Sequence, residues 1–424
     1  MRSPTNPACG SVEHLLSRRA LFGGMAAAAA TGLVRRPALA RSVQGSGKRV
    51  LQIFLHGGSS QLETWDPKPG TATGGPFRAI PTSVPGLHVC ELLPRTALQM
   101  HRLGLVRSMT GGSDDHGRGQ REIISGRDQP APRDVPDLGA VVAKSCMPDD
   151  FPLPGHILIR GSGAGPGNGS YLGPRYGGVV MEDGKPPAFT ERPAGLDRDA
   201  DVRRAALRAR INDRFAGRRR TADTDAYTFS QVQAIDLLDR RAVFDVELES
   251  DRDRDRYGRH EFGRHCLLAR RLLEHGVPFV QVNHSNYDTH FENFDFHIEQ
   301  LGEFDGPFAT LVEDLAARGL LEDTLVCVMS EFGRTPRINA GYGRDHWGKS
   351  WSVLLGGAGI QPGAVIGATS ADGTEVVDRP VDHGHVFHTI LQAIGVDSTG
   401  DFHVGGREYT IADPAKEPIR EMLA

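Results

Sequence analysis

Residues 304–334 read FDGPFATLVEDLAARGLLEDTLVCVMSEFGR. Apolar residues recur at helical spacing from Phe304 to Arg318, and Gly319 stands where a helix C-cap is expected. The continuous apolar run Leu325–Met329 then predicts a buried strand. A helix that leads into a buried strand is typical of an α/β protein with a parallel sheet.

Further predicted strands and helices flank this stretch. Apolar runs predict strands at Arg49–Leu55, Leu103–Ser108, Val277–Val282 and Trp351–Leu355, and helical spacing predicts helices at Cys266–His275 and His385–Ile394. Residues 160–192 are dense in Gly and Pro, and we interpret them as a long surface loop or an insertion. We expect an α/β fold with a central, mostly parallel sheet and helices on both faces, in which the strands ending at Leu55, Val282 and Met329 are neighbours.

The N-terminus has the features of an export signal. Arg18 and Arg19 directly precede an apolar run that begins at Leu21 and ends near Val34, and Ala38-Leu39-Ala40 offers a cleavage site. The paired arginines indicate the twin-arginine pathway. A membrane anchor is the alternative, but this run is too short and too rich in Ala and Gly to span a bilayer. We therefore expect residues 1–40 to be a twin-arginine signal peptide and residues 41–424 to be periplasmic or secreted.

Composition limits the other classes of function. The formal net charge of −4 gives no reason to expect nucleic-acid binding. No segment after the signal is long and apolar enough to predict a membrane span. Four cysteines follow the signal without a C-x-x-C pair, so a zinc–thiolate cluster is not expected, although one or two disulfides are possible in an oxidising compartment. Residues 198–260 are highly charged and predict a helical insertion with solvated faces, or alternatively a basic surface for a partner.

Metal-competent side chains follow the predicted strands. They are His56 after the first strand, Asp114, Asp115 and His116 after the second, His284, Asp288 and His290 after the third, Glu331 and Arg334 after the fourth, and Asp345 and His346 before the next. Sites in open α/β sheets lie beyond the carboxyl ends of the strands, so these loops are expected to converge on one crevice.

The residue types point to a metal site. Imidazoles together with carboxylates suit Zn²⁺, Mn²⁺ or Fe better than Ca²⁺, which prefers oxygen ligands alone. The candidate ligands are His56, Asp288, His290, Glu331, Asp345 and His346. The expected cofactor is a divalent metal ion, with Zn, Mn, Ca and Mg all left open. Arg334 is the candidate catalytic clamp for an anion, because a planar guanidinium binds phosphate or sulfate through two hydrogen bonds.

Each of these residues also has a structural interpretation. His56 could simply belong to a turn, and Asp114-Asp115 could cap the helix that follows. Glu331 and Arg334 could form a structural ion pair. Asp382-His383-Gly384-His385 offers further donors, but it could equally form the N-cap of the last helix.

Three motifs carry a family resemblance. Phe54–Gly58, Ser330–Pro336 and Gly343–Trp347 resemble the hallmarks of bacterial secreted proteins called domain of unknown function 1501. That family is placed in the alkaline phosphatase and sulfatase superfamily. The resemblance, which extends over nearly the whole mature chain, implies an alkaline phosphatase-like fold, a site for one or two metals, and chemistry on phosphate or sulfate esters.

The sequence departs from the superfamily pattern at several positions. Glu331 stands where the sulfatase motif has a metal-binding Asp, and Phe332 stands where it has His or Asn. The first strand delivers His56 in place of an Asp ligand. The place of the Cys or Ser nucleophile falls on or near His116, which makes this residue a candidate general acid/base or an atypical nucleophile. A covalent Ser or Cys intermediate is therefore not supported.

Two functions from different classes remain. The first is an exported metal-dependent hydrolase that acts on a small anionic ester or on a sulfated or phosphorylated glycan. The second is a non-catalytic secreted binding protein that keeps the fold and an altered anion or metal pocket. We favour the hydrolase, because the metal-competent residues stay grouped at the strand ends.

Overall fold

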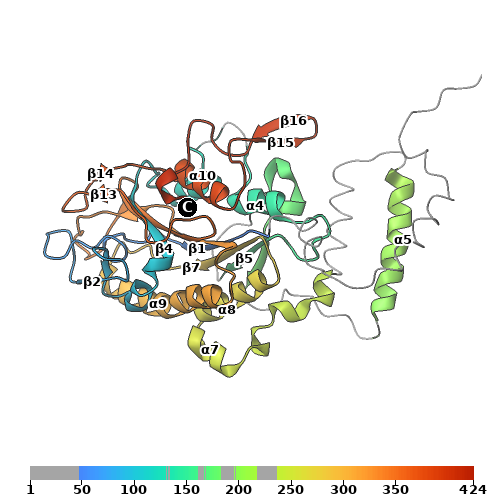
Figure 1. Ribbon diagram of the computed structural model, residues 1–424, viewed down its shortest axis with the longest axis horizontal. Helices are drawn as coiled ribbons and strands as arrows, with labels where there is room; N and C mark the ends of the chain where they lie inside the picture. The colour runs from blue at the N-terminus through green and yellow to red at the C-terminus, as the bar shows by residue number, and fades with distance from the viewer. Residues whose placement is uncertain are drawn as a thin grey trace, which may run out of the picture. The chain divides into compact units, whose positions relative to one another are not determined.

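A computed structural model describes residues 47–129, 131, 134–160, 167, 169–182, 195, 197–216 and 236–424. The signal peptide expected at residues 1–40 lies outside the described residues. An eight-stranded sheet forms the centre of the protein, in the order β12-β4-β11-β8-β1-β7-β5-β6 (Figure 1). Its strands are β1 (Arg49–Leu55), β4 (Leu103–Met109), β5 (His156–Arg160), β6 (Val179–Glu182), β7 (Phe279–His284), β8 (Thr324–Met329), β11 (Trp351–Gly357) and β12 (Val365–Ile366).

The sheet is mostly parallel, as expected. β1 pairs in parallel with β7 on one side and with β8 on the other, so that Val50 lies opposite both Phe279 and Leu325. Only β11 runs against its two neighbours, β4 and β8. The prediction that the strands ending at Leu55, Val282 and Met329 are neighbours is therefore confirmed, and their carboxyl ends share one edge of the sheet.

Helices cover both faces of the sheet (Figure 1). The helices α8 (Glu261–Glu274) and α9 (Asn293–Ala317) pack on one face, together with Leu51 and Ile53 of β1. The helices α3 (His116–Ser125), α4 (Leu138–Cys146) and α10 (His383–Ala393) pack on the other face, together with Val50 and Phe54. The alternation along β1 explains why the strand is apolar at most positions, because a parallel strand is buried on both sides.

The structure differs from the sequence prediction in two segments. Residues 160–192 are not simply a loop, because Arg160 ends β5 and Val179–Glu182 forms the edge strand β6. The dense Gly and Pro around this short strand concealed it. The helix expected from Phe304 begins eleven residues earlier, at Asn293, and continues through Pro307.

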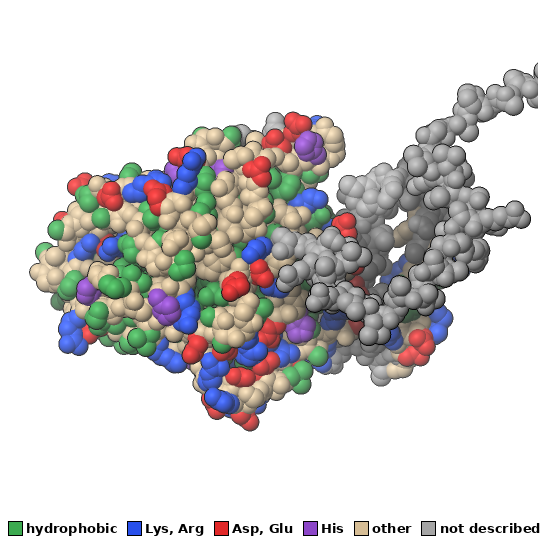
Figure 2. Space-filling model, viewed as in Figure 1, with side chains coloured by type: hydrophobic (Ala, Val, Ile, Leu, Met, Phe, Trp, Pro, Cys, Tyr) green, Lys and Arg blue, Asp and Glu red, His purple; other side chains and the backbone are tan. Residues whose placement is uncertain are grey.

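The predicted insertion at residues 198–260 contains helices where it is described. They are α5 (Arg198–Ala216) and α7 (Asp251–Tyr257). Figure 2 shows acidic and basic side chains gathered over α7, where pairs such as Arg254–Asp251 and Arg259–Asp255 lie at the surface. The charge of α7 is thus largely paired on a solvated face.

Cysteines contribute to the core in this structure. Cys90, Cys266 and Cys327 are buried thiols outside any disulfide, so the disulfides allowed by the sequence do not involve them. Burial raises the pKa of the Cys90 thiol to about 12, which leaves it inert. Among the described helices, none is both long and apolar enough to cross a membrane.

Candidate metal centre

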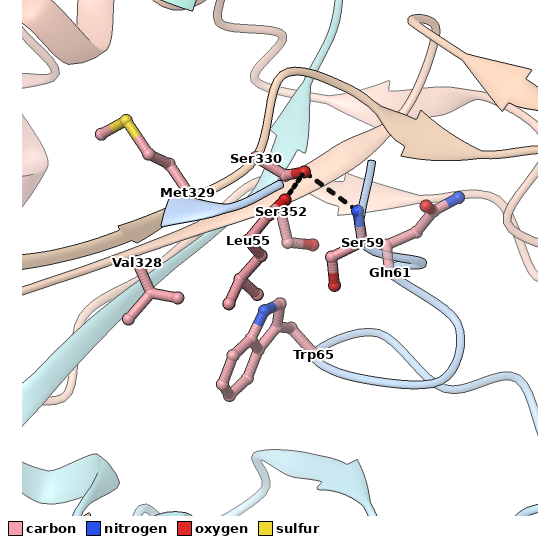
Figure 3. Close-up of a pocket in the computed structure, with 8 residues that line it drawn as sticks. All are labelled: Leu55, Ser59, Gln61, Trp65, Val328, Met329, Ser330 and Ser352. Atoms are coloured by element: carbon pink, nitrogen blue, oxygen red, sulfur yellow. Dashed lines mark hydrogen bonds between the residues drawn. The ribbon is translucent and has the colours of Figure 1, made fainter. Parts of the chain in front are cut away.

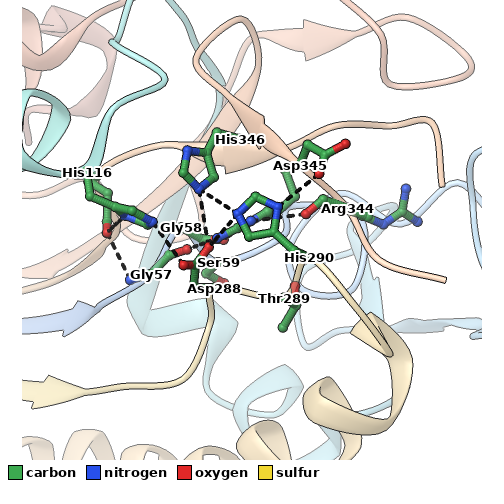
Figure 4. Close-up of polar contacts among 12 residues, drawn as sticks. Gly57, Gly58, Ser59, His116, Asp288, Thr289, His290, Arg344, Asp345 and His346 are labelled. Atoms are coloured by element: carbon green, nitrogen blue, oxygen red, sulfur yellow. Dashed lines mark hydrogen bonds and ion pairs between the residues drawn. The ribbon is translucent and has the colours of Figure 1, made fainter. Parts of the chain in front are cut away.

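Loops from several strands meet at the shared carboxyl edge of the sheet (Figure 4). The Gly57-Gly58 turn follows β1, and Asp288 and His290 lie beyond β7. His116 is the first residue of α3. Past β8, the short strands β9 (Gly333–Arg334) and β10 (His346–Trp347) pair in antiparallel fashion and place His346 opposite Arg334.

Three histidines direct a ring nitrogen at the carboxylate of Asp288. The Nε2 atoms of His290 and His346 are 3.0 Å apart, and they lie 3.1 Å and 3.2 Å from Asp288 Oδ1. His116 Nε2 lies 3.3 Å from Asp288 Oδ2. The ligand atoms of His116, Asp288 and His346 all fall within 4.8 Å of one another. His290 is outside this group of three and reaches it through its contacts with Asp288 and His346. Atoms at these separations can share one first-row metal ion, whose bonds to nitrogen and oxygen are about 2.0–2.2 Å long.

The opposite ring nitrogen of each histidine contacts an oxygen that can only accept. His116 Nδ1 lies 2.8 Å from Glu331 Oε1, and His290 Nδ1 lies 2.9 Å from Asp345 Oδ1. His346 Nδ1 lies 2.6 Å from the main-chain oxygen of Asp114. Each Nδ1 therefore donates a proton, and in the neutral ring the lone pair is at Nε2. This is the arrangement in which outer partners orient metal-binding histidines.

His116 Nε2 provides a further observation that fits a cation site. This nitrogen is buried and makes no hydrogen bond to any described residue, because its contact with Asp288 is outside hydrogen-bond geometry. The hydrogen bond to Glu331 raises the pKa of His116 above its ordinary value, despite the opposing effect of burial. A cation between His116 and Asp288 would satisfy both side chains.

Glu331 lies behind His116 and is almost fully buried. Burial alone would raise the pKa of its carboxyl group, but the hydrogen bond from His116, the charge of His56 and hydrogen bonds from the main chain together outweigh burial and lower this pKa. Gly57 N donates to the same oxygen at 2.9 Å. A side chain at Gly57 would not fit, because a Cβ atom there would lie 2.5 Å from Asp288 N. The Gly-Gly turn thus lets β1 reach both Glu331 and the Asp288 backbone.

Arg334 uses most of its donors within the protein and is fully buried. Its Nε donates to Gly58 O at 2.8 Å, and its Nη1 donates to Arg344 O at 3.0 Å. Its Nη2 donates to Gly57 O and, at 2.6 Å, to Asp288 Oδ1. Burial raises the pKa of Asp288, but the hydrogen bond and charge of Arg334 together with the contacts from His346 and His116 outweigh burial and lower this pKa to about 2. Four of the five N–H groups are thus occupied, and Asp288 is held as a carboxylate.

Other sequence candidates lie beside the cluster or away from it. The ring of His56 is parallel to that of His116 within 8°, with the centroids 6.4 Å apart. Asp115 caps α3 by accepting from Arg118 N. His284 is buried and contacts Tyr287 Oη at 2.8 Å. Asp382 caps α10, which matches the structural interpretation of that motif.

Some residues at the site had no clear signal in the sequence. Asn339 Nδ2 donates to His290 O at 2.9 Å and lies 3.3 Å from Asp345 Oδ1. The main-chain oxygen of Asp114 is a partner that no residue-type argument could identify. Arg344 belongs to a recognised motif, but Glu63, its buried ion-pair partner, stands 281 positions away.

A small cavity lies beneath the loop that follows β1 (Figure 3). Its volume is about 10 Å³, and it is lined by Leu55, Ser59, Gln61, Trp65, Val328, Met329, Ser330 and Ser352. The buried hydroxyls of Ser59 and Ser352 make no hydrogen bond to the described residues. The cavity can hold about one water molecule, so it is too small for an ester substrate.

The family model described as "Protein of unknown function (DUF1501)" matches residues 47–423. The chain belongs to this family. No curated protein matches the sequence of this DUF1501 protein.

Several solved structures are similar to this DUF1501 protein. The PsFucS1 sulfatase from Pseudoalteromonas sp. is 14% identical with a TM-score of 0.42, and the match covers 89% of this chain and 75% of that one. The lipoteichoic acid synthase LtaP from Listeria monocytogenes is 9% identical with a TM-score of 0.40, covering 88% and 76%. An alkaline phosphatase superfamily protein from Vibrio parahaemolyticus is 13% identical with a TM-score of 0.35, covering 88% and 70%.

Proposed function

We propose that this protein is an exported, metal-dependent hydrolase of phosphate or sulfate esters, with one divalent cation held by His116, Asp288, His290 and His346. The observation that carries the proposal is the convergence of three Nε2 atoms on the Asp288 carboxylate. Two neutral imidazoles whose lone pairs face each other at 3.0 Å repel unless a metal ion lies between them or one of the rings takes up a proton.

The local charge also fits a divalent cation. Asp288, Glu331 and Asp345 contribute three negative charges and Arg334 contributes one positive charge, which leaves −2 beside the neutral imidazoles. Nitrogen and carboxylate ligands together favour zinc, manganese or iron over calcium or magnesium.

The exposure of the site favours catalysis over a structural metal. Between 22% and 48% of the side-chain surface of His346, His116, His290 and Asp288 is open to solvent. Structural zinc sites are closed, whereas catalytic sites leave a position open to water or substrate. A bound metal would supply Lewis-acid polarisation of the ester and would acidify water.

The protein residues take roles that differ from those expected from the sequence. Glu331 and Asp345, expected as ligands, orient His116 and His290 in this proposal. His116, expected as an acid/base, is a ligand. Arg334, expected as an anion clamp, positions Asp288. His56, expected as a ligand, stacks beside His116 and is the imidazole to which we assign proton transfer.

Water is the proposed nucleophile. The expected nucleophile position falls on or near His116, whose Nε2 faces Asp288 in the ligand cluster. The proposed substrate is a small anionic ester or a sulfated or phosphorylated glycan that reaches the cluster from its open side. The paired Arg18-Arg19 before an apolar run supports export through the twin-arginine pathway to the periplasm or beyond.

A non-catalytic binding protein is the second candidate. One observation favours it. Four of the five N–H groups of Arg334 already donate to protein acceptors, so only one remains to bind an anion. Such a protein would take up the metal and bind anions without turnover.

Metal analysis and a substrate screen distinguish these candidates. Wild type, His346→Ala and the surface control His403→Ala would be assayed for metal content and for turnover of chromogenic phosphate and sulfate esters. The hydrolase proposal expects about one metal ion per chain, with turnover in wild type and His403→Ala and loss of both in His346→Ala. Metal without turnover would favour the binding protein, and wild type without metal would contradict both metal-dependent proposals.

A further inference from the structure

A buried ion pair lies next to the candidate metal centre without contributing to its ligands. Arg344 Nε donates to Glu63 Oε2 at 2.9 Å, and Nη2 donates to Glu63 Oε1 at 2.7 Å. Both side chains are fully buried. Two parallel hydrogen bonds fix the guanidinium in one orientation, which a lysine could not reproduce.

The remaining donors of Arg344 reach three further carbonyl groups. Nη1 donates to Thr335 O at 3.1 Å and to Pro336 O, while Nη2 donates to Thr73 O at 2.7 Å. All five N–H groups are therefore used. The Arg344 side chain is thus hydrogen-bonded to the loop after β1, to the turn at Thr73 and to the segment that follows β9.

The main chain of Arg344 is joined to the site itself. Its N–H donates to Thr289 O at 2.9 Å, and Thr289 stands between Asp288 and His290. Its carbonyl oxygen accepts from Arg334 Nη1 at 3.0 Å, and Arg334 holds Asp288. Asp345 and His346 follow directly in the chain. Movement of Arg344 would therefore shift three of the four proposed ligands.

We propose that Glu63 and Arg344 are positioning residues of the metal centre, which set the spacing of Asp288, His290 and His346 without touching the metal. This inference rests on the metal centre proposed above. A buried ion pair is weak evidence for stability, since desolvation offsets much of the attraction. The pair contacts the loop that carries Asp288 and His290 and directly precedes His346 in the chain, so we assign it the role of holding these ligands at their observed spacing.

The test compares two buried ion pairs. Glu63→Gln keeps the shape of the side chain and removes its charge, whereas Asp314→Asn does the same to the distant pair of Asp314 with Arg270, whose atoms are 3.1 Å apart. Cobalt(II) would be titrated into each metal-free folded protein, and its visible absorption would report the coordination geometry. Urea unfolding would report stability separately.

We expect both substitutions to lower stability, but only Glu63→Gln to weaken cobalt binding, by about 10–100-fold, and to change the cobalt spectrum. Glu63→Asp keeps the charge with a shorter side chain, and it is expected to change the spectrum in the same direction. If Glu63→Gln does not fold, the cobalt spectrum of Glu63→Asp tests the positioning role instead.

Two results would overturn the inference, and they are distinguishable. Wild-type affinity and spectrum in folded Glu63→Gln, or in Glu63→Asp if the first variant does not fold, would refute the positioning role while leaving the metal centre intact. Wild-type protein that takes up no cobalt would remove the metal centre, and the positioning role would fall with it.

Discussion

The Nε2 atoms of His290 and His346 lie 3.0 Å apart, while Nδ1 of each ring contacts an oxygen that can only accept. In the neutral rings both Nε2 lone pairs therefore point toward the same space. Asp288 Oδ1 lies 3.1 Å and 3.2 Å from these two nitrogens. The arrangement fits the proposed metal centre, in which Asp345 and the main chain of Asp114 orient the two histidines.

Glu331→Gln should weaken metal binding without abolishing it. The amide oxygen can still accept from His116 Nδ1 and Gly57 N, but it no longer increases the basicity of the imidazole. Loss of such an outer partner lowers metal affinity by roughly 10–100-fold. Zinc titration against a chelator would measure this loss, with Asp288→Asn as a ligand variant for comparison. Equal loss in the two variants would indicate that Glu331 is itself a ligand.

Arg334→Gln should lower both stability and metal affinity. The substitution leaves the buried carbonyl groups of Gly57 and Gly58 without their donor, which costs roughly 1–3 kcal/mol per group. It also removes the hydrogen bond from Arg334 Nη2 that holds the Asp288 carboxylate in place, which is why metal affinity should fall. The matched control is Arg379→Gln in the surface pair with Glu421, where a change of about 1 kcal/mol or less is expected. Urea unfolding and metal titration would measure the two effects, and unchanged metal affinity would count against the positioning role of Arg334.

The fold could be predicted from sequence because buried parallel strands have a strong local pattern. β1 and β8 are continuous apolar runs that match the expected strands closely. The short edge strand β6 was missed, since four residues among glycines carry little periodicity. The start of α9 was missed because Gly302 interrupts the helical signal before Phe304, while tertiary packing keeps the helix intact.

The sequence could predict which side chains lie close together, but not the contacts that each of them makes. The strand-end rule predicted that Asp288, His290 and His346 converge, and their side chains are in contact. Which nitrogen of a histidine faces the cluster depends on its partner, such as Glu331 for His116, and sequence order does not reveal that partner. Glu63 was missed because its relation to the site exists only after folding brings it to Arg344.

His156 should make the protein sensitive to acid. This residue begins β5, is 2% exposed, and contacts Tyr176 O at 3.2 Å through Nδ1. Burial lowers its pKa from 6.5 to about 4. Because the unfolded chain takes up this proton more readily, the free energy of unfolding should fall by roughly 3 kcal/mol as the pH drops from about 6.5 to about 4.

His156→Gln should lack this part of the pH dependence, because the amide does not titrate. Urea unfolding of both proteins at about pH 7 and about pH 4.5 would measure the difference. Identical slopes of stability against pH in the two proteins would show that His156 is not responsible.

Export should depend on Arg18 and Arg19. Replacing both with lysine is expected to leave the precursor in the cytoplasm, because the twin-arginine pathway reads the arginine pair. Replacing Arg35 and Arg36, the pair after the apolar run, is the matched control and should leave export unchanged. Fractionation of cells with detection of the mature chain would check this, and normal periplasmic protein from the Arg18/Arg19 variant would refute the pathway.

The most direct test is the position of the metal. Crystals of the zinc-loaded protein would be measured on both sides of the zinc absorption edge, and the anomalous difference map would locate the ion. We expect one peak about 2.0–2.2 Å from the Nε2 atoms of His116, His290 and His346 and from a carboxylate oxygen of Asp288. A peak bonded to Glu331 or Asp345 instead, or no peak among these four side chains, would contradict it.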